Sequence, residues 1–205
     1  MPRLPLAVFA LLSLCAVRAA DSREAFLKLI DRPRVALAAN ASPPTAKDGL
    51  TEIAFNFATE TDQRVPGMLI KASTSSGRRP VVVSLHGTGG NKESQRAYLS
   101  ELARAGFIGV AIDGRYHGAR AAGGSAAKSK EYVAAILRTI RTGKELPFFF
   151  DTAWDVMRLI DYLETRDDID ARRIGLIGFS KGGIETYLAA AVDPRVAVAV
   201  PCIGV

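Results

Sequence analysis

Cysteine and histidine are scarce in this chain of 205 residues, which contains two of each. Cys15 lies in an apolar N-terminal run that we expect to be removed as a signal peptide. Cys202 then has no partner in the rest of the chain, so a disulfide framework is excluded. The same scarcity leaves no cluster with metal-ligand spacing, so we expect no metal ion and no other cofactor. The sequence also lacks a glycine-rich phosphate loop that ends in lysine and serine or threonine, which argues against nucleotide use.

The chain has little excess charge of either sign. Its 27 lysines and arginines stand against 21 acidic residues, and the formal net charge is +6. The basic residues are scattered between acidic ones, a pattern typical of a solvated surface, so we expect no nucleic-acid partner. The length and the 48% of hydrophobic residues suit one globular domain.

The most prominent apolar run lies at the N-terminus. Arg3 precedes apolar residues from Leu6 to Val17, a stretch too short to cross a bilayer. Small residues at Val17 and Ala19 suit a signal-peptidase site. We therefore expect residues 1–19 to be a signal peptide, the protein to be secreted or periplasmic, and no stable membrane insertion after cleavage. A buried helix or a membrane anchor is the alternative interpretation.

The following segments predict a lead-in and then one domain. Residues 20–50 are polar and interrupted by prolines, whereas residues 51–205 carry regular apolar patterns. The domain begins with two strands, and the second covers Arg64–Lys71. Pro66 lacks an N–H group, which predicts that this second strand lies at a sheet edge. Three apolar residues that alternate with other residues mark the first strand: Ile53, Phe55 and Phe57.

Four further apolar runs alternate with segments of helical periodicity. This order predicts an α/β protein with a mostly parallel sheet and helices on both faces. Residues 114–150 interrupt the order and could form a lid over the site. The predicted strands are Pro80–Leu85, Phe107–Ile112, Arg173–Phe179 and Val196–Val200. The helices between them follow Asn91 and carry Val133–Ile140, Val156–Leu163 and Lys181–Val192.

The segment Gly178-Phe179-Ser180-Lys181-Gly182 joins a predicted buried strand directly to a predicted helix. A Gly-x-Ser-x-Gly pattern is weak evidence by itself, but this context favours a strained turn that raises the serine hydroxyl above the sheet edge. Gly178 and Gly182 have no side chains to obstruct such a turn. We predict that Ser180 is a catalytic nucleophile. A tight turn with a capping serine and no chemistry is the alternative.

The glycine-rich segment His86-Gly87-Thr88-Gly89-Gly90 follows another predicted buried strand. Attack of a serine on a carbonyl group creates an oxyanion, which needs preorganised N–H donors. We expect the backbone N–H groups of Lys181 and Thr88 to be these donors, with Gly89 as the next choice. His86, Gly87 and Gly89 would shape the loop. A flexible glycine turn is the alternative interpretation.

These motifs resemble those of the α/β-hydrolase superfamily. Residues 81–90, 113–118 and 168–183 are similar to the branch that includes dienelactone hydrolases, acetyl xylan esterases and the catalytic domain of prolyl oligopeptidases. The resemblance covers residues 50–205 and implies an α/β-hydrolase fold with the first six of eight usual strands. It also implies Ser180 as nucleophile, with backbone donors at Lys181 and Thr88.

The expected partners of the serine are missing from this order. In the fold that the resemblance implies, an acid and then a histidine follow the nucleophile. The 25 residues after Ser180 include Glu185 and Asp193 but no histidine, and both His86 and His117 precede it. We expect the two histidines to support loops, and the last two strands of the fold to be absent. The chain would then be a fragment or a natural pseudoenzyme, with little or no turnover.

The leading functional hypothesis is a serine hydrolase that forms an acyl-enzyme on Ser180, with a small-molecule ester or acylated sugar as substrate. A serine peptidase of the prolyl-oligopeptidase type would use the same chemistry, but the short N-terminal segment holds no propeller. A non-catalytic binding protein of the same fold is the third hypothesis. None of these patterns predicts an oligomeric state. The hydrolase hypothesis requires Ser180 to be exposed and to lie beside the Thr88 loop.

Overall fold

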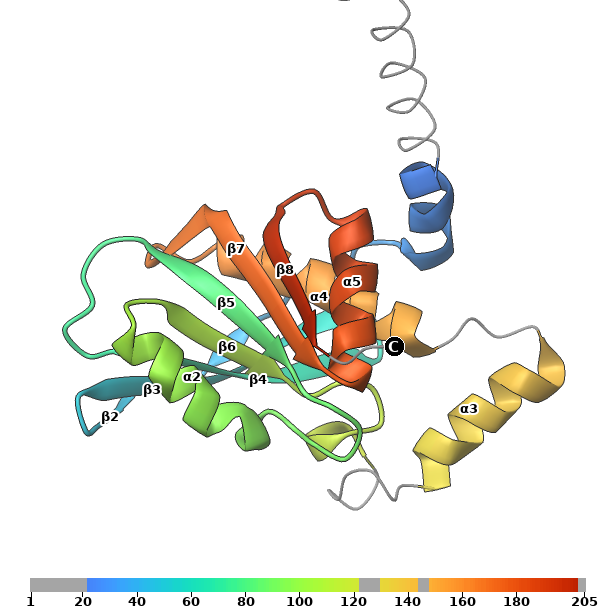
Figure 1. Ribbon diagram of the computed structural model, residues 1–205, viewed down its shortest axis with the longest axis horizontal. Helices are drawn as coiled ribbons and strands as arrows, with labels where there is room; N and C mark the ends of the chain where they lie inside the picture. Colours follow the sequence, from blue (N-terminus) through green and yellow to red (C-terminus); the bar gives the residue numbers. More distant parts are fainter. Residues whose placement is uncertain (1–21, 122–129, 144–147, 203–205) are drawn as a thin grey trace, which may run out of the picture.

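The computed structural model describes residues 22–121, 130–143 and 148–202, and a sheet of eight strands forms its centre (Figure 1). The strand order is β1-β3-β4-β6-β5-β7-β8, and β2 pairs with β3. The strands are β1 (Asn40–Ala41), β2 (Thr45–Lys47), β3 (Leu50–Glu60), β4 (Gln63–Ala72), β5 (Arg79–Leu85), β6 (Ile108–Ile112), β7 (Ile169–Phe179) and β8 (Val196–Cys202).

Helices cover both faces of the sheet, as the α/β pattern predicts. One helix spans residues 22–30. The others are the 3-10 turns η1 (Glu93–Gln95) and η2 (Gly118–Arg120) and the α-helices α2 (Arg96–Arg104), α3 (Lys130–Thr142), α4 (Phe148–Glu164) and α5 (Lys181–Val192). Within the described residues, no helix combines the length and the apolar character that a membrane span requires.

The sheet is mixed rather than uniformly parallel. β5 pairs in parallel with β6 and β7, and β7 pairs in parallel with β8, whereas β1, β2 and β4 pair antiparallel with β3. β4 also pairs antiparallel with β6. The expected α/β fold class is confirmed, and its antiparallel part begins within residues 20–50, which the sequence predicted as a lead-in.

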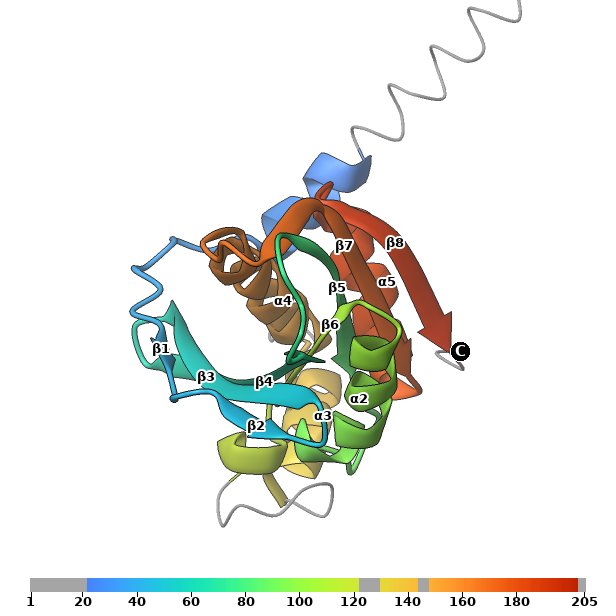
Figure 2. The same ribbon diagram turned by 90° about the vertical axis from the view of Figure 1, so that its left-hand side faces the viewer.

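The two faces of the sheet bury two separate apolar clusters. On one face, α4 and α5 pack against β3 and the parallel strands, and Trp154 of α4 is fully buried there. The Trp154 Nε1–H donates to the carbonyl oxygen of Thr59 at 3.1 Å, so its polar atom is satisfied. On the other face, Leu99 and Ala103 of α2 pack on β4 and β6 (Figure 2). The alternation of Ile53, Phe55 and Phe57 therefore predicted the correct buried face of β3.

The prediction that Pro66 restricts its strand to a sheet edge is wrong. β4 lies inside the sheet, between β3 and β6. The carbonyl oxygen of Pro66 accepts a hydrogen bond from the Asp113 N–H at 3.0 Å, so the position of its missing N–H also faces the β6 side. The ladder between β4 and β6 ends at the pair Gly67 and Ile112, so Pro66 lies just beyond its end, where a missing N–H is tolerated.

Two apolar surfaces remain exposed. The apolar spacing in α3 predicted a helix correctly, but this helix buries Tyr132 and Ala135, while Val133, Leu137 and Ile140 are 50%, 39% and 74% exposed.

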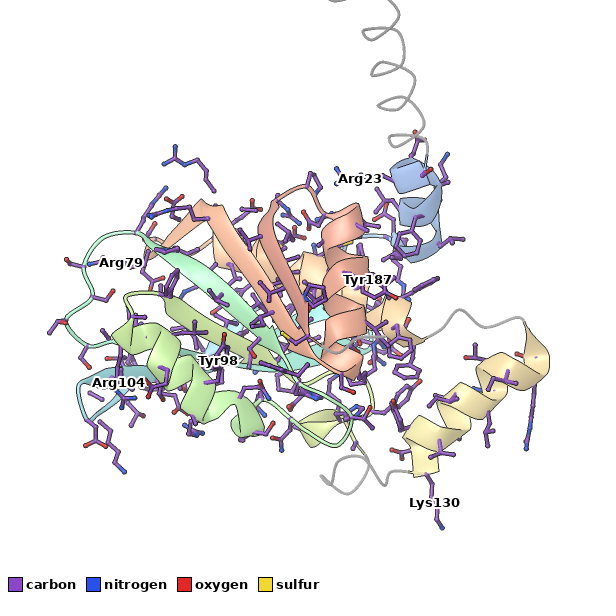
Figure 3. The ribbon with its side chains drawn as sticks, in the orientation of Figure 1. Arg23, Arg79, Tyr98, Arg104, Lys130 and Tyr187 are labelled. Atoms are coloured by element: carbon purple, nitrogen blue, oxygen red, sulfur yellow. The ribbon has the colours of Figure 1, made fainter. Side chains whose placement is uncertain are left out.

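On the α2 face, β7 and β8 border a groove of about 550 Å³. Figure 3 shows Tyr98, which lines this groove from α2. The apolar strand β8 lies at the sheet edge, with Val198 and Val200 exposed.

Substitution of Gly67 by alanine is expected to destabilise the fold. Gly67 pairs with Phe55 across β3 and β4, and the Phe55 ring lies over the glycine, so an added Cβ would overlap it. The ring cannot move easily because it stacks on Tyr162 at 4.9 Å. We expect Gly67→Ala to lower the free energy of unfolding by about 1–3 kcal/mol in urea denaturation.

Gly175→Ala is the matched control for this substitution. It also lies within a strand, but an added Cβ would meet no atom closer than 3.8 Å. An equal loss of stability in both variants would show that the replacement of any glycine in a strand, rather than the overlap with Phe55, causes the loss.

Candidate active site

Ser180 occupies the turn between β7 and α5, which Figure 1 shows at one edge of the sheet. Its backbone angles are φ 53° and ψ −117°, a sparsely populated conformation for a residue with a side chain. Its carbonyl oxygen accepts from the N–H groups of Gly183 at 2.8 Å and Ile184 at 3.3 Å. Its own N–H donates to the carbonyl oxygen of Cys202 at 2.9 Å. The residue is exposed, as the hydrolase hypothesis requires.

The glycines on either side of Ser180 permit this turn. A Cβ added to Gly178 would overlap the backbone of Gly182, and a Cβ added to Gly182 would overlap the carbonyl oxygen of Leu85. Leu85 is the last residue of β5, so the start of α5 lies directly against the end of that strand. Backbone atoms cannot rotate away as a side chain can, so these two positions admit only glycine without a shift of the main chain.

The glycine-rich loop after β5 lies beside Ser180. A Cβ added to Gly87 would be 3.2 Å from the Phe179 carbonyl oxygen and 3.5 Å from the Ser180 Cβ. Gly89 adopts φ 92°, a left-handed conformation that glycine tolerates. The glycine-rich loop and the turn at Ser180, which the sequence analysis expected to lie side by side, are therefore adjacent.

Two backbone N–H groups in this region are available to donate hydrogen bonds. Within the described residues, the backbone N–H groups of Thr88 and Lys181 have no hydrogen-bond partner. The Thr88 side chain lies 3.2 Å from the Tyr132 hydroxyl, so α3 contacts the glycine-rich loop. Lys181 begins α5, where free N–H groups favour a negatively charged ligand.

His86 connects two loops and has a fixed protonation state. Its Nε2 accepts a hydrogen bond from the Gly114 N–H at 3.0 Å, so Nδ1 carries the proton and donates to the Gly87 carbonyl oxygen at 2.9 Å. Burial, together with the nearby Lys181 ammonium group, lowers the pKa of His86 to about 3. The imidazole is therefore neutral near pH 7.

His117 is fully buried on the loop after β6. Its Nδ1 lies 2.7 Å from the Arg115 carbonyl oxygen, and its ring contacts His86 at 5.1 Å and Tyr132 at 5.0 Å between centroids. Burial lowers the pKa of His117 from its ordinary value. Within the described residues, Ser180 Oγ makes no hydrogen bond, so neither histidine is bonded to it.

The side chain of Lys181 forms a buried ion pair that the sequence analysis missed. Its Nζ lies 2.8 Å and 2.9 Å from the two carboxylate oxygens of Glu185, and both side chains are nearly inaccessible. Burial raises the pKa of Glu185, and the Lys181 ammonium group opposes that rise. A Cβ added to Gly114 would be 3.0 Å from the Lys181 Nζ. The spacing of four residues on a helix was the available signal.

The other candidate acids also form ion pairs or hydrogen bonds with neighbouring residues. Asp193 pairs with Arg195 at 2.7 Å. Asp113 accepts hydrogen bonds from the Lys92 backbone at 2.9 Å and the Ala119 N–H at 3.0 Å. Within the described residues, no group of three or more histidine, cysteine or acidic side chains is arranged to hold a metal ion.

The mixed sheet, the strained serine turn and the adjacent glycine-rich loop define the α/β-hydrolase fold. The family comparison agrees. The family model for acetyl xylan esterase (AXE1) matches residues 47–204, and this chain belongs to that family. The expected resemblance to the acetyl xylan esterase branch is thereby confirmed.

Individual relatives are longer than this chain. YtaP of Bacillus subtilis (strain 168), named as a candidate hydrolase, is 27% identical over 151 residues, which cover 67% of this chain and 48% of that protein. Acetyl xylan esterase 1 of Thermoanaerobacterium sp. JW/SL YS485 is 20% identical, with a TM-score of 0.65 and coverage of 88% of this chain and 56% of that one.

A candidate acetyl xylan esterase of Bacteroides fragilis NCTC 9343 has a TM-score of 0.74 at 16% identity, over 87% of this chain and 50% of that one. The chain therefore spans about half the length of these relatives.

Alanine at Gly178 or Gly182 is expected to disrupt the serine turn. The added Cβ would meet backbone, so the main chain must shift, and we expect each substitution to lower the free energy of unfolding by at least about 3 kcal/mol. Gly87→Ala is the graded control, because its closest contact would be 3.2 Å. In urea denaturation, the free energy of unfolding of Gly87→Ala should be well above that of the other two variants. Equal free energies would contradict the close backbone contacts at Gly178 and Gly182.

The stability of the protein should fall as the pH drops from about 6.5 towards 3. His86 has a pKa of about 3 in the folded protein, so only the unfolded chain binds the proton over most of this range. The slope contributed by His86 is about 1.4 kcal/mol per pH unit at most, and His117 acts in the same direction.

The neutral variant His86→Gln isolates this effect. Its slope between pH 5 and 6.5 in urea denaturation should be clearly shallower than that of the wild type. Glu185, whose raised pKa acts in the opposite direction, is present in both proteins and cancels in the comparison. Identical slopes would show that His86 is not held neutral.

Proposed function

We propose that this protein is a serine hydrolase for carboxylic esters and that Ser180 is its nucleophile. The observation that carries the proposal is the exposed serine at a strained strand-to-helix turn, with the Gly87 backbone beside it. Strain at this position is compatible with function because it holds the hydroxyl clear of the sheet edge.

The reaction follows from the groups around Ser180. The serine oxygen attacks the ester carbonyl carbon and gives up its proton to a base, and the carbonyl oxygen becomes an oxyanion. The free N–H groups of Thr88 and Lys181 are proposed to donate to this oxyanion, each contributing about 100–1,000-fold in rate. The C–O bond to the alcohol then breaks, the alcohol takes a proton, and water releases the acyl group from Ser180.

The substrate class is proposed to be an acetyl or related ester on a polysaccharide. Support comes from the family to which the chain belongs and from relatives that are named acetyl xylan esterases. An extracellular location, with residues 1–19 as a signal peptide, would suit such a polymer. Those residues lie outside the described part of the chain. The segment 114–150 is proposed to act as a lid, because Tyr132 within it contacts Thr88.

The non-catalytic binding protein remains the second candidate function. The observation that favours it is the engagement of both histidines elsewhere, His86 with Gly87 and Gly114, and His117 with Arg115. Glu185 is likewise held by Lys181. A peptidase would use the same serine, and a panel of acyl esters and peptide amides would separate the two activities.

The 205-residue chain by itself is expected to hydrolyse esters very slowly. Loss of the proton acceptor from a serine triad costs about 10⁶-fold in kcat, and no histidine is bonded to Ser180 here. Added imidazole should supply the missing base. We expect it to increase the rate at which a fluorophosphonate probe labels Ser180, as read by peptide mass spectrometry.

Ser180→Ala is the control for this experiment, and it should show no adduct at this position under either condition. Absence of an adduct on Ser180 at high imidazole would favour the binding protein. Turnover comparable to ordinary esterases without imidazole, abolished by Ser180→Ala, would show that another base is in place.

A further inference from the structure

A polar cavity of about 430 Å³ opens beside the loop that follows β6. Nothing in the reaction proposed for Ser180 uses it. Its walls come from the start of β4, the loop after β6, η2 and the first turn of α3. The described residues that line it are Gln63, Arg115, Tyr116, Arg120 and Glu131.

The cavity lies at the same sheet edge as Ser180. β4 runs antiparallel to β6, so the start of β4 and the end of β6 meet at one edge. β5 lies between β6 and β7, so the ends of β6 and β7 are about 10 Å apart, two strand spacings. Glu131 of the cavity wall precedes Tyr132, whose hydroxyl lies 3.2 Å from Thr88 Oγ1. A short oligomer could therefore reach both places at once.

The charges around the cavity favour a neutral ligand. Arg120 Nη1 lies 2.6 Å from the Asp155 carboxylate, and Arg115 pairs with both Asp155, at 3.4 Å, and Glu60. Glu131 adds a further acidic side chain to the wall. The two guanidinium groups are thus already neutralised by buried or half-buried carboxylates, which leaves little net attraction for a phosphate or carboxylate.

Hydrogen-bonding capacity nevertheless remains. Within the described residues, Arg115 Nη1 and Gln63 Nε2 have no hydrogen-bond partner, and Gln63 Oε1 is 3.4 Å from Arg120 Nη2. The side chains of Arg115 and Arg120 are only 11% and 6% exposed, so their ion pairs hold them in place before any ligand arrives. Fixed planar donors of this kind suit hydroxyl groups and cost little entropy on binding.

Tyr116 adds an aromatic ring to these polar groups. It is half-buried, and its ring meets Phe148 edge to face with 6.0 Å between centroids, which limits its movement. Its backbone has φ 63°, a conformation that is unusual for a bulky residue. A fixed aromatic surface next to fixed hydrogen-bond donors matches a ring that has both hydroxyl groups and apolar C–H groups.

We propose that this cavity is a subsite for a neutral, hydroxyl-rich sugar unit next to the unit whose ester reacts at Ser180. The proposal rests on the function proposed for Ser180 and adds a location and residues for substrate recognition. Tyr116 contributes the stacking surface, Gln63 and Arg115 contribute donors, and Glu131 contributes an acceptor.

Binding of unacetylated xylotetraose to the 205-residue protein tests the proposal without any need for hydrolysis. Isothermal titration or NMR titration would measure the Kd for the wild type, for Tyr116→Asn and for Gln63→Ala. Asparagine tolerates the left-handed backbone at position 116 but removes the ring. We expect Tyr116→Asn to weaken binding at least about tenfold, which is about 1.4 kcal/mol, and Gln63→Ala several-fold.

Two controls accompany these variants. Tyr187→Ala removes an exposed tyrosine on α5, labelled in Figure 3, that does not line the cavity, and it should bind as the wild type does. Ser180→Ala should also retain binding. Circular dichroism of each variant would confirm that it is folded.

The outcomes separate the subsite from the proposed reaction. The subsite is overturned if the wild type does not bind xylotetraose, if Tyr116→Asn binds as tightly as Tyr187→Ala, or if inorganic phosphate competes at the same residues. Probe labelling of Ser180 without oligosaccharide binding would retain the hydrolase and reject the subsite. Binding without any labelling of Ser180 would retain the subsite and reject the hydrolase.

Discussion

The contact between the end of β5 and the start of α5 is the constraint on which the site depends. Gly182 lies so close to the Leu85 carbonyl oxygen that no side chain fits between them, and Gly178 is equally close to Gly182. This approach forces the chain to turn within one residue and places Ser180 in a strained conformation. It also brings Gly87 against Ser180, so Ser180 and the glycine-rich loop are positioned by the same backbone contact.

Buried charge and hydrogen bonds stabilise the arrangement around that contact. The Lys181–Glu185 pair lies at the start of α5, and the Lys181 ammonium group lies next to Gly114. His86 joins the glycine-rich loop to Gly114 through hydrogen bonds from both ring nitrogens. Because burial beside a cation lowers its pKa to about 3, the imidazole is a weak proton acceptor, which suits a connecting role better than proton transfer.

The loop after β6 links the serine turn to the polar cavity. Asp113 at its start holds the backbone on the α2 side, while Arg115 and Arg120 reach α4 through Asp155. Tyr132 of α3 contacts Thr88 on one side and Phe148 on the other. A change in this loop would therefore alter the glycine-rich loop and the cavity together.

The sequence by itself determined the elements whose signals are local. Alternating apolar residues predicted β3, continuous apolar runs predicted β5 to β8, and the Gly-x-Ser-x-Gly pattern between a strand and a helix predicted the turn at Ser180. Tertiary structure alone decided the interior position of β4, the exposed apolar face of α3 and the Lys181–Glu185 pair. The reason is physical: strand order, helix orientation and burial of a charge depend on residues far apart in the chain, and no local pattern encodes those distances.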